Sequence, residues 1–265
     1  MYNKIIAGVP LWQFQQLADE EGVAHYISGR EGEWRNGANM ILNLSYGVGD
    51  NPSHVRQNRA IVAKAMGVSE DKLIFPSQTH SNNVRVVNDT STKETLMETD
   101  ALVTDIPGIC ISILVADCVP ILVLDTKRKV VAAIHSGWRG TVGKILSNTL
   151  SLMHEHFASQ MNDVRVCIGP SIGPSGYEVG EEVVEAAHKA FPDYADRVLV
   201  PSKQKGKALF NLWEANKLQA VALGIPESQI EIAGICTYTN HDRFFSARRA
   251  FNEGRFAAGI MLTRS

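Results

Sequence analysis

The sequence predicts an α+β fold in which helices cover mixed β-sheets. Three observations indicate it. Apolar, β-branched runs at residues 109–115 and 164–168 are typical of buried strands. Apolar residues from Thr141 to Phe157 recur at three- and four-residue steps, which predicts an amphipathic helix. Two strand-like runs joined by residues 125–129 predict a β-hairpin, which argues against an all-parallel sheet. Mixed strands with intervening helices indicate a layered α/β or α+β domain.

The other elements follow from local signals along the chain. After an amino-terminal hairpin region, Asn51 and Pro52 predict the start of a helix and Gly67 predicts its end. Asn211 and Glu214 suit the N-cap and N3 positions of a helix over residues 211–223. We also expect a helix at residues 179–190 and strands at residues 73–75, 84–87, 121–124, 130–134 and 230–236.

Length and composition limit the classes of protein. At 265 residues, with no linker and no internal repeat, the chain is expected to form one domain, residues 1–265. Hydrophobic residues make up 45% and charged residues 20%, as in globular proteins generally. Because the net charge is only −2, nothing favours nucleic acid as a partner.

Cysteine usage and the absence of long apolar runs predict the cellular setting. The four cysteines each lie in an apolar strand-like stretch, which favours reduced thiols in the cytoplasm. Residues 1–16 lack a signal-peptide pattern, and no apolar run approaches the roughly 18 residues that span a bilayer. We therefore expect a cytoplasmic protein that binds no membrane, as a monomer or a weak homo-oligomer.

Three side chains suited to binding a metal ion, His80, Cys118 and His135, end apolar strand-like runs. Two imidazoles and one thiolate form a natural three-ligand set for Zn²⁺, which leaves the fourth tetrahedral position for water or substrate. The three residues are too far apart in the chain for a zinc finger, so they meet only through tertiary folding. Taken singly, His80 is equally explained as a strand-end cap and Cys118 as a buried small side chain.

The motifs around these residues resemble a known family. In chain order they are N-L-S-Y-G-V-G-D from Asn43, P-S-Q-T-H ending at His80, A-D-C-V-P-I around Cys118, H-S-G-W-R-G from His135, C-I-G-P-S-I from Cys167, Y-E-V from Tyr177, C-T-Y from Cys236 and F-F-S-A-R-R ending at Arg249. The series resembles the laccase-domain family, described both as polyphenol oxidases and as zinc-dependent purine nucleoside phosphorylases.

The resemblance implies an α-β-β-α layered domain and a Zn²⁺ held by His80, Cys118 and His135. It also implies phosphorolysis of adenosine, inosine, guanosine or methylthioadenosine to a purine base and a pentose 1-phosphate, with an adenosine deaminase side activity. The partners are then purine nucleosides and phosphate.

Further side chains are candidates for binding the substrates. Phosphate needs guanidinium or backbone N–H donors, and Arg139 offers both at a strand-to-helix turn. Arg59 and Arg248 are further candidates for phosphate, and Asn43 and Ser45 for the sugar or phosphate. Phe245 is a candidate for stacking on the purine, and Glu178 and Asp117 are candidates for proton transfer. Each also has a structural alternative, namely a surface ion pair for the arginines, a turn for Asn43 and Ser45, the core for Phe245 and a cap for Glu178.

Two other functions stay open. One is copper-dependent oxidation of phenols, but a multicopper enzyme needs several histidine pairs and only His154 and His156 have the H-x-H spacing. The other is a metal-free cysteine hydrolase or deamidase, with Cys118 as the nucleophile and His135 as its base.

Overall fold

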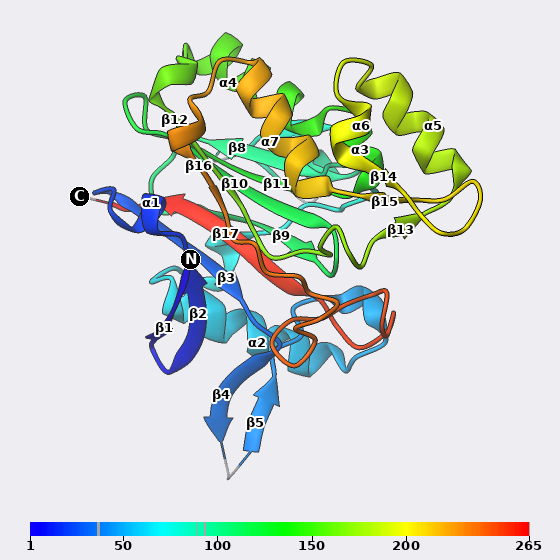
Figure 1. The fold of residues 1–265 in the computed structure, drawn as a ribbon. Coiled ribbons are helices and arrows are strands. Elements are labelled where there is room, and N and C mark those ends of the chain that lie inside the picture. The colour runs from blue at the N-terminus through cyan, green and yellow to red at the C-terminus, as the bar shows by residue number, and fades with distance from the viewer. Residues whose placement is uncertain (36–37, 89, 93, 265) are drawn as a thin grey trace.

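The computed structural model describes residues 1–35, 38–88, 90–92 and 94–264. Two six-stranded sheets lie face to face, and helices cover their outer faces (Figure 1). Helix α2 (Pro52–Ala65) covers the first sheet, and helices α4 (Ile145–Phe157) and α7 (Leu212–Ala222) cover the second. The predicted α+β class and its α-β-β-α arrangement are confirmed.

The first sheet contains both ends of the described chain. Its strand order is β1-β2-β3-β17-β9-β6, and only β6 and β9 pair in parallel. The strands are β1 (Tyr2–Ile6), β2 (Val9–Gln13), β3 (Val23–Ser28), β17 (Phe256–Leu262), β9 (Cys110–Val115) and β6 (Leu73–Ile74). The expected amino-terminal hairpin is β1 with β2.

The second sheet carries the predicted central hairpin. Its order is β16-β12-β10-β11-β8-β7, with β12–β16 and β7–β8 parallel. The strands are β16 (Ile230–Ile232), β12 (Val164–Ile168), β10 (Val119–Asp125), β11 (Val130–Ser136), β8 (Ala101–Thr104) and β7 (Val84–Val86). Within the hairpin, Pro120 lies opposite His135, so the end of β11 lies beside the residues that precede β10.

Smaller elements surround these layers. The helices are α1 (Gln15–Ala18), α3 (Trp138–Val142), α5 (Glu181–Ala190) and α6 (Ala195–Val198). Two small sheets contain β4 (Glu31–Arg35) with β5 (Ala38–Ile41), and β13 (Glu178–Val179), β15 (Ala208–Phe210) and β14 (Leu199–Pro201). Single 3₁₀ turns occur at Tyr46–Val48, Glu70–Lys72, Glu94–Leu96, Met161–Asp163 and Glu227–Gln229. No helix among the described residues is long and apolar enough to cross a membrane.

Alternation along the central strands separates the core into layers. On β10, Leu122 faces the other sheet, whereas Ile121 and Val123 face α4 and α7. Because successive side chains of a strand point to opposite faces, a strand buried on both sides is apolar throughout. All seven residues of β10 are buried, and all except Asp125 at its end are apolar.

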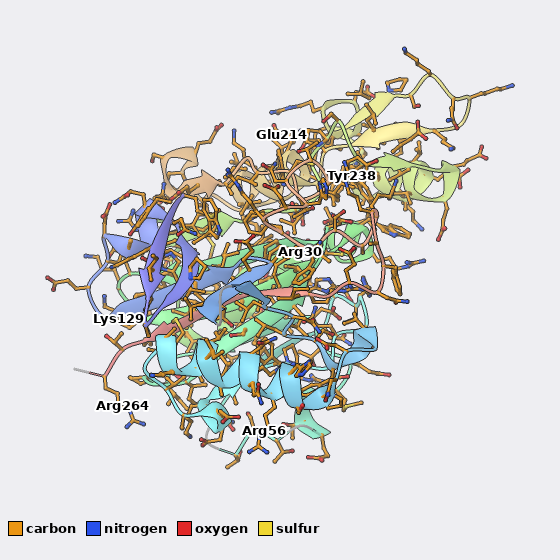
Figure 2. The ribbon with its side chains drawn as sticks, turned by 90° about the horizontal axis from the view of Figure 1, so that it is seen from below. Arg30, Arg56, Lys129, Glu214, Tyr238 and Arg264 are labelled. Atoms are coloured by element: carbon orange, nitrogen blue, oxygen red, sulfur yellow. The ribbon has the colours of Figure 1, made fainter. Side chains whose placement is uncertain are left out.

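The helix ends follow the predicted capping chemistry. The Asn51 side chain accepts a hydrogen bond from the Ser53 amide at 2.9 Å, directly before α2. Asn211 caps α7 by accepting from the Glu214 amide at 3.1 Å, as expected. Arg56, on the outer face of α2, projects into solvent (Figure 2).

Two expected elements differ from the structure. The single helix from Thr141 is two helices, α3 and α4, because Lys144 between them adopts a left-handed conformation with φ 60°. A buried hydrogen bond between the Ser136 and Thr141 hydroxyls, and one that Asn216 donates to Thr141, hold α3 against β11, so the chain must turn before α4 can pack on the sheet. The strand expected at 230–236 ends at Ile232.

Candidate metal centre and cavity

The structure brings His80, Cys118 and His135 together. Their ligand atoms all lie within 4.8 Å of one another, and the two imidazole centroids are 4.9 Å apart. His135 is the buried end of β11, Cys118 directly precedes β10, and His80 lies in a loop with φ 60°. Tetrahedral zinc with bonds of about 2.0–2.3 Å needs ligand atoms about 3.5 Å apart. A contraction of about 1 Å would reach that spacing, so the donor set fits zinc.

Gly137 allows the backbone to approach these ligands. A Cβ atom at this position would lie 2.9 Å from Cys118 Sγ and 3.4 Å from His80 Cδ2. The glycine has φ −72° and ψ −179°, which any residue can adopt, so the need for glycine is steric. The H-S-G-W-R-G motif therefore contains both a ligand, His135, and the space for its neighbours.

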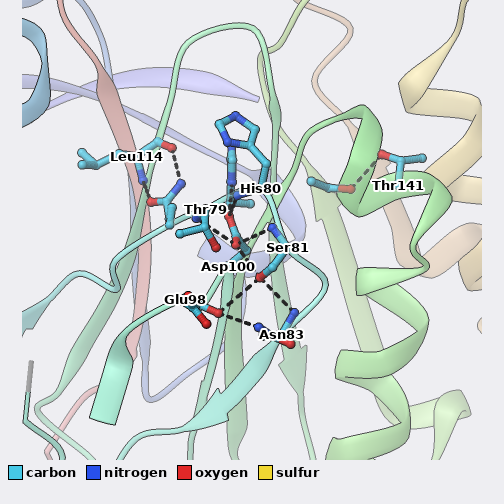
Figure 3. Close-up of polar contacts among 11 residues, drawn as sticks. Thr79, His80, Ser81, Asn83, Glu98, Asp100, Leu114 and Thr141 are labelled. Carbon is cyan, nitrogen blue, oxygen red and sulfur yellow. Dashed lines mark hydrogen bonds and ion pairs between the residues drawn. The ribbon is translucent and has the colours of Figure 1, made fainter. Parts of the chain in front are cut away.

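Asp100 organises two of the three ligands, and sequence reasoning missed it. Its carboxylate accepts a hydrogen bond from His135 Nδ1 at 2.7 Å. It also accepts from the backbone amides of Thr79, His80 and Ser81 at 3.1, 3.1 and 2.8 Å (Figure 3). Burial by itself would raise the pKa of Asp100, but the hydrogen bonds from His135 and Ser81 lower it to about 2. An ionised carboxylate on Nδ1 leaves Nε2 of His135 free to ligate.

The electrostatics of the centre favour a thiolate. Burial opposes ionisation of Cys118, but the neighbouring His135, and then hydrogen bonds from His135 and His80, lower the pKa of its thiol to about 6. Burial likewise opposes charge on His135, and Cys118 and Asp100 raise its pKa to about 9. The thiolate is the form of cysteine that binds metal or attacks a substrate.

A cavity of about 830 Å³ opens beside the three ligands. Three substrate-binding candidates, Ser45, Arg59 and Arg248, lie on its wall. The wall also includes Tyr46 and Phe251, whose side chains are 50% and 69% exposed. Sequence reasoning singled out neither aromatic residue, although Tyr46 lies within the N-L-S-Y-G-V-G-D motif.

Two other candidates lie outside that cavity wall and make contacts elsewhere. The Arg139 side chain is 57% exposed, lies over Trp138 and pairs with Glu182 at 3.7 Å. The Glu178 carboxylate accepts hydrogen bonds from Ser202 Oγ at 2.5 Å and Lys207 Nζ at 3.2 Å. These contacts hold the loop between β14 and β15. For Arg139 this is the surface ion pair expected as its structural alternative, whereas Glu178 joins a neighbouring loop and caps no helix among the described residues.

Phe245 and Asn43 are buried and also lie outside the wall. Phe245 is 1% exposed within the apolar layer between the sheets, so it has no free face for a purine. Asn43 accepts hydrogen bonds from the Ser45 and Arg255 amides at 3.0 and 2.9 Å. It therefore fixes the position of two cavity residues rather than facing the cavity.

Asp117, the residue before Cys118, holds part of the cavity wall in place. It has φ 77°, and its carboxylate accepts from Thr237 Oγ1 at 2.6 Å, Ser246 Oγ at 3.1 Å and the Arg248 amide at 2.7 Å. These bonds attach the loop that carries Arg248 to the end of β9. Asp117 is thus a positioning residue for the cavity.

Three convergent ligands on the wall of a large cavity define an α+β enzyme with a candidate metal centre. The chain belongs to the family described as multi-copper polyphenol oxidoreductase laccase, whose profile matches residues 24–263. The resemblance inferred from the motifs is confirmed.

Named relatives are similar over almost the whole chain. A purine nucleoside phosphorylase of Bacteroides thetaiotaomicron is 40% identical over 94% of this chain and 95% of its own. Adenosine deaminase RL5, from an unknown prokaryotic organism, is 38% identical over 91% of this chain and 94% of its own. The crystal structure of a Bacillus licheniformis hypothetical protein, YfiH, superposes with a TM-score of 0.88 at 28% identity, covering 98% of this chain and 99% of that one.

Proposed function

We propose that this protein is a zinc-dependent purine nucleoside phosphorylase. The observation that carries the proposal is the convergence of His80, Cys118 and His135 on the wall of a cavity that also contains guanidinium groups with no carboxylate partner among the described residues. The names of two relatives with 40% and 34% identity support the same activity.

The proposed substrates are adenosine, inosine, guanosine or methylthioadenosine with inorganic phosphate. A phosphate oxygen forms a bond to the anomeric carbon while the bond from that carbon to the purine nitrogen breaks. The electron pair leaves with the purine, which takes the proton of hydrogen phosphate, so a free base and a pentose 1-phosphate result. The exposed faces of Tyr46 and Phe251 offer surfaces on which a purine can stack.

His80, Cys118 and His135 would hold the zinc ion. Bound there, zinc supplies a Lewis acid that polarises a ligand oxygen or lowers the pKa of a water molecule. Asp100 fixes the tautomer of His135, and Ser45 presents a hydroxyl to the cavity. Within the described residues these three side chains are the one group with metal-ligand spacing, whereas a multicopper oxidase needs several centres, so copper chemistry of that kind is disfavoured.

Adenosine deamination is a second proposed activity of the same cavity. It uses water in place of phosphate and releases ammonia, and the 38% identical deaminase relative supports it. A single ligand set that leaves one metal position free can serve both reactions.

One observation also favours the metal-free hydrolase. Asp100, His135 and Cys118 are arranged in series, with Asp100 on Nδ1 of His135 and the thiol on its other side, as in a nucleophile–base–carboxylate arrangement. Alkylation of Cys118 separates the two: zinc should block it if the thiolate is a ligand, whereas an amide substrate should block it if the thiolate is a nucleophile.

The decisive assay is incubation of zinc-loaded protein with inosine and phosphate, followed by chromatography for hypoxanthine. We expect hypoxanthine only when phosphate is present. Absence of the base with fully metal-loaded protein would contradict the proposal.

We retain three further expectations as proposals: one domain over residues 1–265, a cytoplasmic location, and a monomer or weak homo-oligomer. Reduced cysteines support the location, since all four are free thiols.

A further inference from the structure

Three arginines line the cavity beside the metal-ligating side chains, and none of them pairs with a carboxylate among the described residues. They are Arg59, Arg248 and Arg255. Six arginines elsewhere in the described chain do pair with a carboxylate, as Arg197 does with Glu214 at 2.8 Å. The cavity therefore holds positive charge that the described part of the protein leaves unpaired.

Backbone carbonyls and aromatic rings are the partners of these guanidiniums. Arg59 Nε donates to the Leu44 carbonyl at 2.9 Å, and Arg255 Nη1 donates to two carbonyls at 2.9 and 2.8 Å. Arg248 donates to the Glu178 carbonyl at 3.3 and 3.4 Å. A carbonyl carries no net charge and each guanidinium has five N–H donors, so charge and donors both remain for a ligand.

The cavity wall has one carboxylate, that of Asp117. Three guanidiniums exceed this carboxylate and the Cys118 thiolate by one positive charge, and a zinc ion at the three ligands would add two more. Asp117 is already engaged by three donors. Unpaired charges in a partly enclosed site are costly unless a counter-ion binds there. An anion such as hydrogen phosphate would offset this positive charge.

Arg255 is placed next to the metal ligands by sheet register. It directly precedes β17, in which Phe256 lies opposite Val115 of β9. Continuing this antiparallel register by one residue sets Arg255 opposite Ala116, two positions before Cys118. Burial lowers the pKa of Arg255 while Cys118 and Asp117 raise it, so its charge interacts with both.

We propose that Arg255, together with Arg248, binds the inorganic phosphate co-substrate beside the metal centre. This inference rests on the proposed phosphorolysis. Guanidinium groups bind phosphate oxygens through paired, charge-assisted hydrogen bonds, which would hold one remaining oxygen toward the anomeric carbon. Arg255 is thus a phosphate-specificity residue, outside the candidates that the motifs suggested.

The test compares Arg255→Gln and Arg255→Lys with the control Arg249→Gln in zinc-loaded full-length protein. Arg249 also donates to a carbonyl, that of Tyr238, and lies over an aromatic ring, but it is outside the cavity. In Arg255→Gln we expect the phosphate KM to rise about 10- to 100-fold, with the nucleoside KM and the phosphate-independent deamination of adenosine within about threefold of wild type. Lysine should restore part of the loss, and Arg249→Gln should behave as wild type.

A phosphate KM unchanged in folded, metal-loaded Arg255→Gln would overturn the inference, as would an equal loss of deamination and phosphorolysis. Calorimetric titration of inorganic phosphate separates it from the proposed function. If wild type binds phosphate, Arg255→Gln does not, and neither releases purine, the phosphorylase proposal fails, while Arg255 stands as a phosphate-binding residue. If both bind phosphate equally, the inference fails whatever the activity. Should the glutamine variant not fold, the lysine variant is judged by the same titration.

Discussion

Replacing Gly137 by alanine tests whether the space beside the ligands is part of the metal centre. The new Cβ would lie 2.9 Å from Cys118 Sγ. Non-bonded heavy atoms prefer separations of about 3.5–4.0 Å, so the sulfur or the backbone must retreat by about 0.6–1 Å. Metal–ligand distances tolerate only about 0.2 Å of error. We therefore expect Gly137→Ala to weaken zinc binding about 10- to 100-fold.

Gly180→Ala is a matched control for this substitution. Both glycines are helix N-caps with nearly the same backbone, φ −72° and ψ −179° at Gly137, φ −85° and ψ 179° at Gly180. A Cβ at Gly180 meets no atom within 4 Å. The two variants thus share any cost of alanine at an N-cap, and they differ in the contact with the thiol.

Zinc affinity is measured by competition with a chromophoric chelator, and hypoxanthine release from inosine is measured in parallel. Overpacking should also lower the unfolding free energy of Gly137→Ala by about 1–3 kcal/mol, which urea titration records. If the Gly137 variant binds zinc and turns over inosine as well as the Gly180 variant does, the steric argument is refuted.

Three other outcomes are expected. Asp100→Asn keeps the side-chain shape but loses the negative charge that accepts hydrogen bonds from His135 and Ser81. Zinc affinity in the same competition assay should therefore fall about 10- to 100-fold. Unchanged affinity would contradict the proposal that Asp100 orients His135. Chelator treatment should abolish purine release and lower the melting temperature, and zinc should restore both, whereas recovery with copper alone would contradict the choice of metal. Burial lowers the pKa of His25 from its ordinary value of about 6.5 to about 4, while Glu231 opposes the shift. Between those pH values the unfolded chain binds a proton that the folded chain does not, so this stability is present above pH 6.5 and falls by about 3 kcal/mol as the pH drops through 4. His25→Gln should reduce that slope in urea titrations at pH 7 and 4.5, and an identical slope would refute the assignment.

Local signals predicted most elements because their causes lie within a few residues. The cap at Asn51, the start at Pro52 and the buried Val55 and Val62 are all contained in α2 and its ends. The hairpin of β10 and β11 needed two apolar runs and a short turn. The exception, the break at Lys144, arose from hydrogen bonds between Thr141 and the distant Asn216, which no local pattern records.

In the candidate site, too, residue chemistry predicted some positions, whereas distant contacts determined others. Donor chemistry identified His80, Cys118 and His135, since imidazole and thiolate groups at strand ends are recognisable from residue type. Phe245 and Glu178 were chosen for chemistry that suits a purine or a proton, but packing between the sheets and pairing with Lys207 determine where those side chains lie.

By itself, the sequence determined most of the elements, the family that the chain joins and the three side chains that converge as candidate metal ligands. Only the tertiary structure showed that Asp100 accepts a hydrogen bond from His135, that Gly137 lies beside the Cys118 sulfur and that Arg255 lines the cavity. The physical reason is range: periodicity and capping act between neighbours in the chain, whereas these contacts depend on the register of strands that pair across the whole protein.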